Sequence, residues 1–84
     1  MKFQVSFSSK VIKQLQQLPL STQKQYDKAF QLIATEGPAY PSLRTHRYQL
    51  KKREIWGSAA SMALRFYWDY AGVRSILVIS ISSH

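Results

Sequence analysis

Hydrophobic and polar residues alternate at the start of the chain and then change to a helical spacing. Phe3, Val5 and Phe7 are separated by single polar residues, a pattern that predicts a half-buried strand. Apolar residues then recur three or four positions apart in two successive stretches, which predicts two helices. These positions are Val11, Ile12, Leu15 and Leu18 in the first stretch, and Tyr26, Ala29, Phe30 and Ile33 in the second.

Both helices carry start and stop signals. Either serine at 8–9 can cap the first helix, and Pro19 ends it. Thr22 and Gln25 have the Thr-x-x-Gln spacing of a capping box for the second helix. Gly37, followed by a proline, stops that helix. Because the connection between the helices is so short, they must lie antiparallel, and the sequence predicts a helical hairpin.

The second half of the chain has the period of β-strands. A loop at 38–43 precedes a basic stretch, and residues 54–58 fit one strand. Apolar residues at every second position from 62 to 68 predict an amphipathic strand. Its core side carries Met62, Leu64, Phe66 and Trp68, and its other side carries Ala63, Arg65, Tyr67 and Asp69. Residues 73–81 are apolar on both faces, which predicts a central strand.

The last two strands also predict a pairing register. With a two-residue hairpin loop at 71–72, paired residue numbers sum to 143. Phe66 then lies opposite Leu77 on the core side, while Arg65 lies opposite Val78 on the other side. The other pairs on the core side are Leu64 with Ile79 and Met62 with Ile81.

The expected fold class is α+β, in one domain over residues 1–84. An N-terminal strand and the helical hairpin pack on one face of a small antiparallel sheet, in the order strand, helix, helix and then three or four strands. The helices cover the face that carries Phe66 and Trp68. The opposite face, which carries Arg65 and Tyr67, stays open to a ligand.

Charge is concentrated in one part of the chain. The net charge is +8, and five of the twelve Lys and Arg residues fall within residues 44–53. They are Arg44, Arg47, Lys51, Lys52 and Arg53. Repulsion of this kind is tolerated where a polyanion neutralises it, so we expect a nucleic acid or an acidic protein as partner. The alternative interpretation is a flexible, solvated basic loop.

Composition excludes several other classes. The chain has no cysteine, which excludes disulfides and Cys-based zinc sites and fits a cytoplasmic protein. No apolar run is long enough to cross a bilayer, and no basic amphipathic helix indicates a membrane surface. The acidic residues form no metal-ligand pattern, and the three isolated glycines form no phosphate-binding loop. We therefore expect no metal and no small-molecule cofactor.

Arg65 and the two histidines are the candidates for chemistry. Arg65 projects from a strand on the open face, where a guanidinium can clamp a phosphate, although it could also be a solvated charge or a partner of Asp69. His46 and His84 are candidates because histidine is the side-chain type best suited to general acid–base chemistry near neutral pH. By parity His84 belongs with Val78 on the Arg65 face. The basic stretch would then hold a phosphate backbone, with Tyr48 as a possible stacking ring.

At this point the pattern resembles the RelE/ParE superfamily, the toxin halves of type II toxin–antitoxin pairs. The resemblance runs over nearly the whole chain, through FSSKVIKQLQQL, QYDKAFQLI, PSLRTHRY, REIWGSAASMALRFYWDY and ILVISISSH. Its more specific elements are Leu-Arg-x-His after the loop, an arginine in the next amphipathic strand, and a histidine after the final strand.

The resemblance implies a ribosome-dependent mRNA endonuclease that cleaves by 2′-hydroxyl attack without a metal. It matches Arg65 to the arginine that contacts the scissile phosphate, His84 to an acid or phosphate ligand, and His46 to a loop histidine used by some members. RNA would be bound by Arg44, Arg47, Lys51, Lys52, Arg53 and Tyr67. It also implies an acidic antitoxin that wraps the toxin and neutralises its basic surface.

Two departures from the family pattern keep alternatives open. Many active members place two catalytic lysines, or other polar residues, in the strand before the arginine, and the nearest positions in this chain are Trp56 and Ser58. The family's longer C-terminal ending is here reduced to Ile-Ser-Ser-His. The alternatives are a ParE-like toxin that inhibits DNA gyrase by contact, and a degenerate toxin that binds only RNA or its antitoxin.

Overall fold

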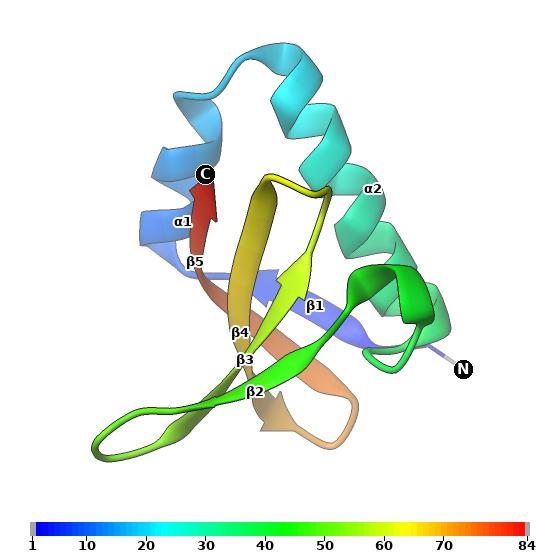
Figure 1. Cartoon of the computed structure of the whole chain (residues 1–84), viewed down its shortest axis with the longest axis vertical. Coiled ribbons are helices and arrows are strands. Elements are labelled where there is room, and N and C mark those ends of the chain that lie inside the picture. Colours follow the sequence, from blue (N-terminus) through cyan, green and yellow to red (C-terminus); the bar gives the residue numbers. More distant parts are fainter. Residues whose placement is uncertain (1, 84) are drawn as a thin grey trace.

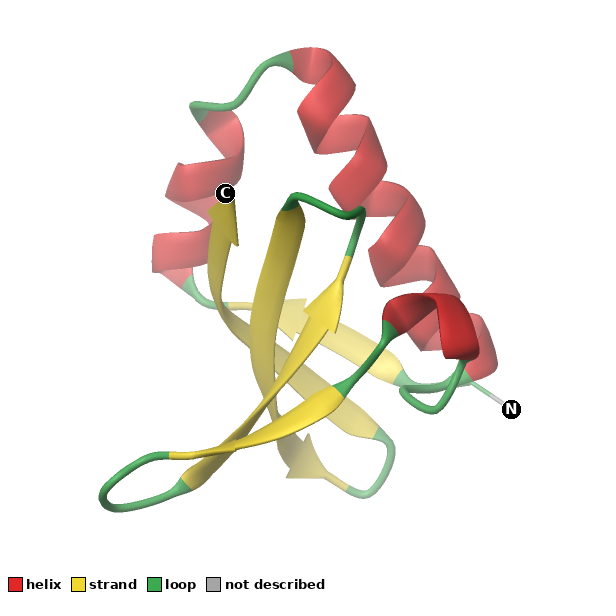
Figure 2. Cartoon of the chain, viewed as in Figure 1, coloured by secondary structure: helices red, strands yellow, loops and turns green. Residues whose placement is uncertain are grey.

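Two helices lie on one face of a five-stranded sheet in the computed structural model, which describes residues 2–83 (Figures 1 and 2). The elements are β1 Gln4–Phe7, α1 Ser9–Gln16, α2 Leu20–Glu36, the short 3-10 turn η1 Pro41–Leu43, β2 His46–Gln49, β3 Glu54–Ala59, β4 Leu64–Gly72 and β5 Ser75–Ser83. The strand order is β1-β5-β4-β3-β2. The predicted α+β fold class is confirmed. Two details were wrong: β1 is an edge strand of the sheet and does not pack on its face, and the sheet is mixed, because β1 pairs in parallel with β5 while the other neighbours are antiparallel.

The helical hairpin forms as predicted except for one cap. The Ser8 hydroxyl accepts a hydrogen bond from the backbone N–H of Val11 and so caps α1. The capping box of Thr22 and Gln25 does not form, because α2 begins directly after Pro19 and both residues lie inside the helix. Gly37 ends α2 with a φ of +87°, a conformation that favours glycine.

The core lies between the helices and the sheet. Val11, Tyr26, Ala29, Phe30 and Ile33 enter it from the helices, as predicted. The Phe30 ring packs edge-on against Phe7 and Phe66, with ring centroids 4.9 and 5.0 Å away. Ile12, predicted as a core position, stays 46% exposed.

Met62 is not on the core face of β4, contrary to the prediction. The backbone N–H groups of Ala60 and Ser61 both donate to the carbonyl oxygen of Leu64, so the chain turns here before β4 begins. Met62 lies in this turn and is 91% exposed. The alternating pattern begins at Met62, two residues before β4 begins at Leu64.

The predicted register of β4 and β5 is also wrong. Gly72 pairs with Ser75, so the loop consists of Val73 and Arg74, and Phe66 pairs with Ile81 instead of Leu77. Tyr70 now pairs with Ile76, and its ring packs edge-on against two tryptophan rings.

An irregularity in β5 places Ile76 and Val78 on the core side of the sheet. The pairing shifts between Tyr67 and Trp68, which leaves Ile79 as an extra residue in β5. As a result Val78 and Ile76 are fully buried on the core side, although the predicted register put Val78 with Arg65. Leu77 and Ile79, predicted for the core, are only partly buried.

Four of the ten residues in the basic stretch form an edge strand, β2, and not a loop. β2 pairs with β3, and the backbone N–H of Leu50 donates to the carbonyl oxygen of Arg53 to close the turn between them. The β2–β3 hairpin projects from the body of the protein (Figure 1). Every residue of β2 is exposed, because β2 is the last strand of the sheet.

Candidate nucleic-acid interface

Strand pairing brings the predicted site residues to the face that the helices leave open. His46, Gly57 and Tyr67 are paired in turn across β2, β3 and β4, and the next row pairs Ala59 with Arg65. Paired residues share a face, and the neighbours of Arg65 in β4, Leu64 and Phe66, are buried under the helices. Arg65, Tyr67 and His46 therefore lie on the open face.

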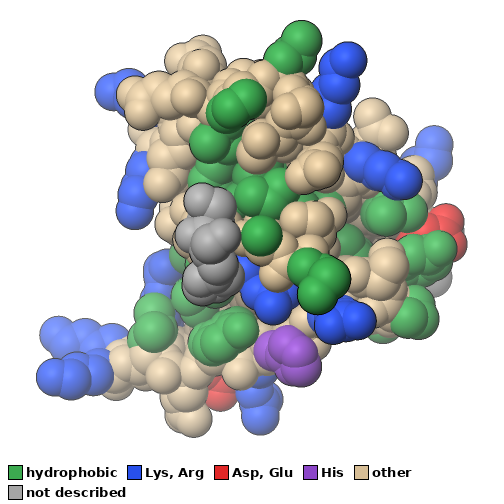
Figure 3. Space-filling model, turned by 45° about the horizontal axis from the view of Figure 1, so that its top comes forward, with side chains coloured by type: hydrophobic (Ala, Val, Ile, Leu, Met, Phe, Trp, Pro, Cys, Tyr) green, Lys and Arg blue, Asp and Glu red, His purple; other side chains and the backbone are tan. Residues whose placement is uncertain are grey.

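Two arginines line a pocket on this face. Arg44 and Arg65 share a pocket of about 320 Å³ with Ser42, Ala59, Ser61 and Met62. Arg44 has a φ of +47° and follows η1, where its backbone N–H donates to the carbonyl oxygen of Pro41. Figure 3 shows a histidine side chain, in purple, beside blue Lys or Arg side chains and green hydrophobic ones. A pocket with two guanidinium groups, two hydroxyl groups and no carboxylate is suited to a phosphate.

Arg65 does not pair with Asp69. Asp69 Oδ1 instead accepts a hydrogen bond of 2.8 Å from the backbone N–H of Tyr70. Within residues 2–83, the single ion pair joins Arg47 to Glu54 at 3.7 Å. The guanidinium of Arg65 is thus left for a ligand.

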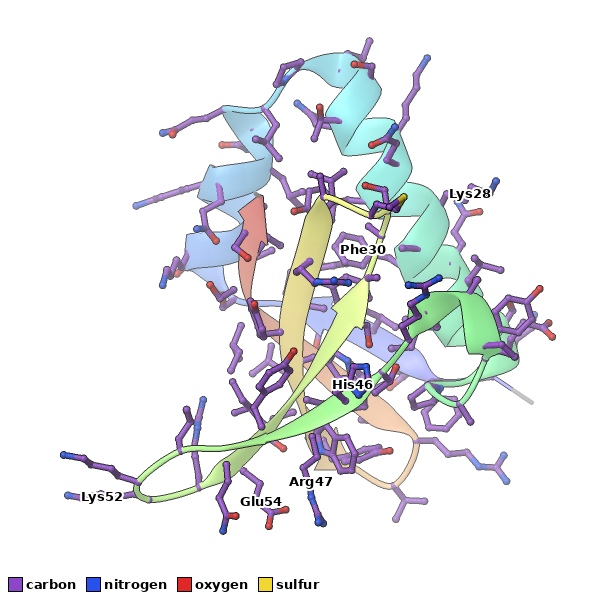
Figure 4. All side chains as sticks on the ribbon, in the orientation of Figure 1. Lys28, Phe30, His46, Arg47, Lys52 and Glu54 are labelled. Atoms are coloured by element: carbon purple, nitrogen blue, oxygen red, sulfur yellow. The ribbon has the colours of Figure 1, made fainter. Side chains whose placement is uncertain are left out.

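The other predicted RNA-binding residues divide into two groups. Arg47 is paired with Trp56 and so lies on the helix-covered side of the sheet, where Glu54 is its partner (Figure 4). Lys51 and Lys52 lie in the turn that ends the β2–β3 hairpin, and Arg53 follows them. Figure 4 shows Lys52 well away from His46. His84 lies outside the described residues.

The two positions matched to family lysines are part of the core. Ser58 is 1% exposed, and its hydroxyl accepts a hydrogen bond from Trp68 Nε1 at 2.9 Å and lies 2.8 Å from Thr45 Oγ1. The Trp56 ring stacks on the Trp68 ring at 5.7 Å. The open face of β3 instead presents Ile55, Gly57 and Ala59, none of which can transfer a proton.

Tyr26 links the second helix to the strand that carries Arg65. Its hydroxyl, on a residue 1% exposed, lies 3.1 Å from the carbonyl oxygen of Arg65 and 2.9 Å from that of Ser82. Burial raises the pKa of Tyr26, so the phenol stays protonated and can donate. The sequence pattern predicted Tyr26 only as a core residue. Its hydroxyl group could have indicated the link to β4, because a buried tyrosine hydroxyl needs a hydrogen-bond partner.

Gly57 is the second residue whose role the sequence did not reveal. A methyl group there would lie 2.5 Å from Cε2 of Tyr48 and 3.1 Å from Cε1 of Tyr67. The two rings pack edge-to-face over the glycine, with centroids 5.9 Å apart. A glycine inside a strand often marks such a close approach.

Two classes of site are not formed by the described part of the chain. Residues 2–83 contain no group of three His, Asp or Glu side chains that could hold a metal ion. In the same range, no helix is long and apolar enough to span a membrane.

The fold matches solved toxin structures, although neither the family models nor the curated proteins give a match. No family model matches the chain, and no curated protein sequence is similar to it. A chain of the archaeal RelE–RelB complex from Pyrococcus horikoshii OT3 has a TM-score of 0.79 at 13% identity, over 99% of this chain and 96% of that one. The YoeB–YefM complex from Staphylococcus aureus gives 0.75 at 13% identity, over 100% and 99%. The YoeB/ParE toxin from Agrobacterium tumefaciens gives 0.74 at 10% identity, over 98% and 99%. The protein therefore has the RelE/ParE toxin fold.

Proposed function

We propose that this protein is the toxin of a toxin–antitoxin pair and that it cleaves mRNA in the cytoplasm, in the translating ribosome. The observation that carries the proposal is the pocket between Arg44 and Arg65, which lies on the same open face as His46. A phosphodiester is the ligand that such a pocket suits. The structural matches to RelE and YoeB chains support the same class of function.

The proposed chemistry needs only groups from the protein and the RNA. The 2′-oxygen attacks the adjacent phosphorus and the bond from phosphorus to the 5′-oxygen breaks, which leaves a 2′,3′-cyclic phosphate and a 5′-hydroxyl. His46 accepts the proton of the 2′-hydroxyl, and His84 donates one to the leaving oxygen. Arg65 and Arg44 stabilise the charge that develops on the phosphate oxygens.

Controlled expression tests this proposal. Wild-type protein should stop growth, and mapping of mRNA ends by primer extension should show cuts only within translated regions. The Arg65→Ala variant should relieve both effects. Lys28→Ala is the matched control, because it removes one positive charge from an exposed position of α2 (Figure 4). Equal cleavage by wild-type and Arg65→Ala proteins would contradict the proposed role of the pocket.

One observation favours a second, non-enzymatic function. The open face of β3 offers Ile55, Gly57 and Ala59, so His46 and residues outside β3 must supply all proton transfer. A gyrase inhibitor or a degenerate RNA binder needs no such groups. If growth stops with intact messages and a DNA-damage response, gyrase is the target. Unaffected growth would favour the degenerate toxin.

The partner in this proposal is an acidic antitoxin. A net charge of +8 on 84 residues favours binding of an acidic chain, and such a chain would mask the cationic pocket. Co-expression with an acidic protein encoded beside this one should yield a soluble complex and restore growth. A neighbouring gene product without this effect would not be the antitoxin.

A further inference from the structure

One ring of the tyrosine pair that packs over Gly57 remains open to solvent. Packing over the glycine alone does not require this exposure. Tyr48 is 41% exposed although it contacts Tyr67, because β2 is the outermost strand of the sheet. Tyr67 is half-buried beside it. Gly57 holds the two rings close to the sheet, since any side chain there would displace them.

The rings lie at a useful distance from the arginine pocket. Tyr67 follows Arg65 by two residues on the same strand, a spacing of about 6.6 Å. This spacing is close to the length of one extended nucleotide. A phosphate in the pocket would therefore place the neighbouring base over the tyrosine pair.

We propose that the exposed Tyr48 ring, which Tyr67 contacts edge-to-face, stacks on one base of a single-stranded RNA whose adjoining phosphate lies between Arg44 and Arg65. This inference rests on the proposed function, which identifies the ligand as RNA. It adds that the RNA is single-stranded at this point and that one of its bases binds at the tyrosine pair. Bases in a duplex are already stacked and paired, so only an unpaired base can lie on the rings. Stacking accepts any base, because every base has a π face.

A purely structural role for Tyr48 predicts a different response to substitution. Aromatic and aliphatic side chains both cover a neighbouring glycine, whereas only an aromatic ring stacks on a base. Tyr48→Phe keeps the ring, and Tyr48→Leu keeps apolar bulk without it. Tyr40→Leu is the matched control, because Tyr40 is similarly exposed, at 37%, and lies just before η1, outside the tyrosine pair.

The test is fluorescence anisotropy with a labelled eight-nucleotide oligoadenosine RNA. Tyr48→Leu should bind about tenfold more weakly than wild type, while Tyr48→Phe and Tyr40→Leu should stay within about twofold. With an oligonucleotide of the same length that lacks its bases, wild type and Tyr48→Leu should bind equally. The salt dependence should be the same for both proteins, because no phosphate contact is lost.

Several results would overturn the inference. They are equal binding of oligoadenosine by wild type and Tyr48→Leu, an equal loss with the abasic oligonucleotide, and no RNA binding by wild type. Thermal unfolding of each variant checks that it is folded. If Tyr48→Leu does not fold, wild type alone still tests the inference, because base stacking requires it to bind oligoadenosine more tightly than the abasic oligonucleotide. Tyr48-dependent binding without mRNA cleavage would overturn the proposed enzymatic function and leave this subsite standing. If mRNA is cleaved but RNA binding does not depend on Tyr48, the proposed enzymatic function stands and this subsite is overturned.

Discussion

The two faces of the sheet use the same strands for different purposes. On the covered face of β4, Phe66 and Trp68 are fully buried, whereas on the open face Arg65 and Tyr67 are only partly buried. Residues that alternate along one strand thus divide between the core and the candidate site. Stability should depend on the covered face and ligand binding on the open face, so substitutions should separate the two.

Polar groups on the two faces also differ. On the covered face the Ser58 hydroxyl is bound to Trp68 and Thr45 at short distances. On the open face Arg65 forms no ion pair within the described residues. A polar group already bound inside the protein stabilises the fold, and one left without a partner is available to a ligand.

The largest expected effect is that of Trp68→Ala. Trp68 is fully buried and contacts Trp56, Tyr70 and Ser58, so its removal leaves a large cavity. The free energy of unfolding should fall by about 3–5 kcal/mol, measured by urea denaturation. A loss below about 1 kcal/mol would mean that the covered face is not the main source of stability.

Ser58→Ala should have the next largest effect. It leaves the buried Trp68 Nε1–H without an acceptor, which should cost about 1–3 kcal/mol of unfolding free energy. Ser42→Ala is the control, since Ser42 is exposed, and it should change stability by less than about 0.5 kcal/mol. Similar values for the two variants in urea denaturation would show that the buried hydroxyl has no special role.

The residues of the covered face could be predicted from the sequence in helices and strands that are apolar on one face and polar on the other. The helical stripe through Tyr26 and Phe30, and the alternation of Phe66 and Trp68 with Arg65, gave the fold class. The register of β5 could not be predicted in the same way. That strand is apolar on both faces, so a shift at Ile79 exchanges one apolar side chain for another and leaves no trace in the pattern.

The candidate site was predictable to a similar extent. Arg65 and Tyr67 follow from alternation on one strand, and Arg44 and His46 from the loop motif. Gly57 and Tyr26 act through contacts that only the folded chain creates, such as the hydrogen bond from Tyr26 to a carbonyl 39 residues away. Arg47 belongs to the basic stretch by sequence but lies on the covered side, because neighbouring residues of a strand point to opposite faces.

Tyr26→Phe should test the link between the two faces. Loss of the hydroxyl removes hydrogen bonds to the carbonyls of Arg65 and Ser82 and should cost about 0.5–1.5 kcal/mol. The pKa of Tyr26 is raised in the folded state, so above pH 10 the unfolded chain loses this proton first. The stability of wild type should therefore fall as pH rises above 10, and more steeply than that of Tyr26→Phe. Equal slopes in denaturation at several pH values would contradict this assignment.

The smallest expected effect is that of Arg47→Ala, which is compared with a substitution of Arg44 in the same basic stretch. Arg47 and its partner Glu54 are largely exposed, so Arg47→Ala should change the unfolding free energy by no more than about 0.5 kcal/mol. Because Arg47 lies on the covered side, the same change should weaken RNA binding less than Arg44→Gln, which removes a guanidinium from the pocket. Anisotropy measurements at about 0.15 M salt, where charges more than about 8 Å apart are largely screened, give the comparison. Equal losses for the two variants would mean that RNA responds to the total charge of the basic stretch and not to the face on which each arginine lies.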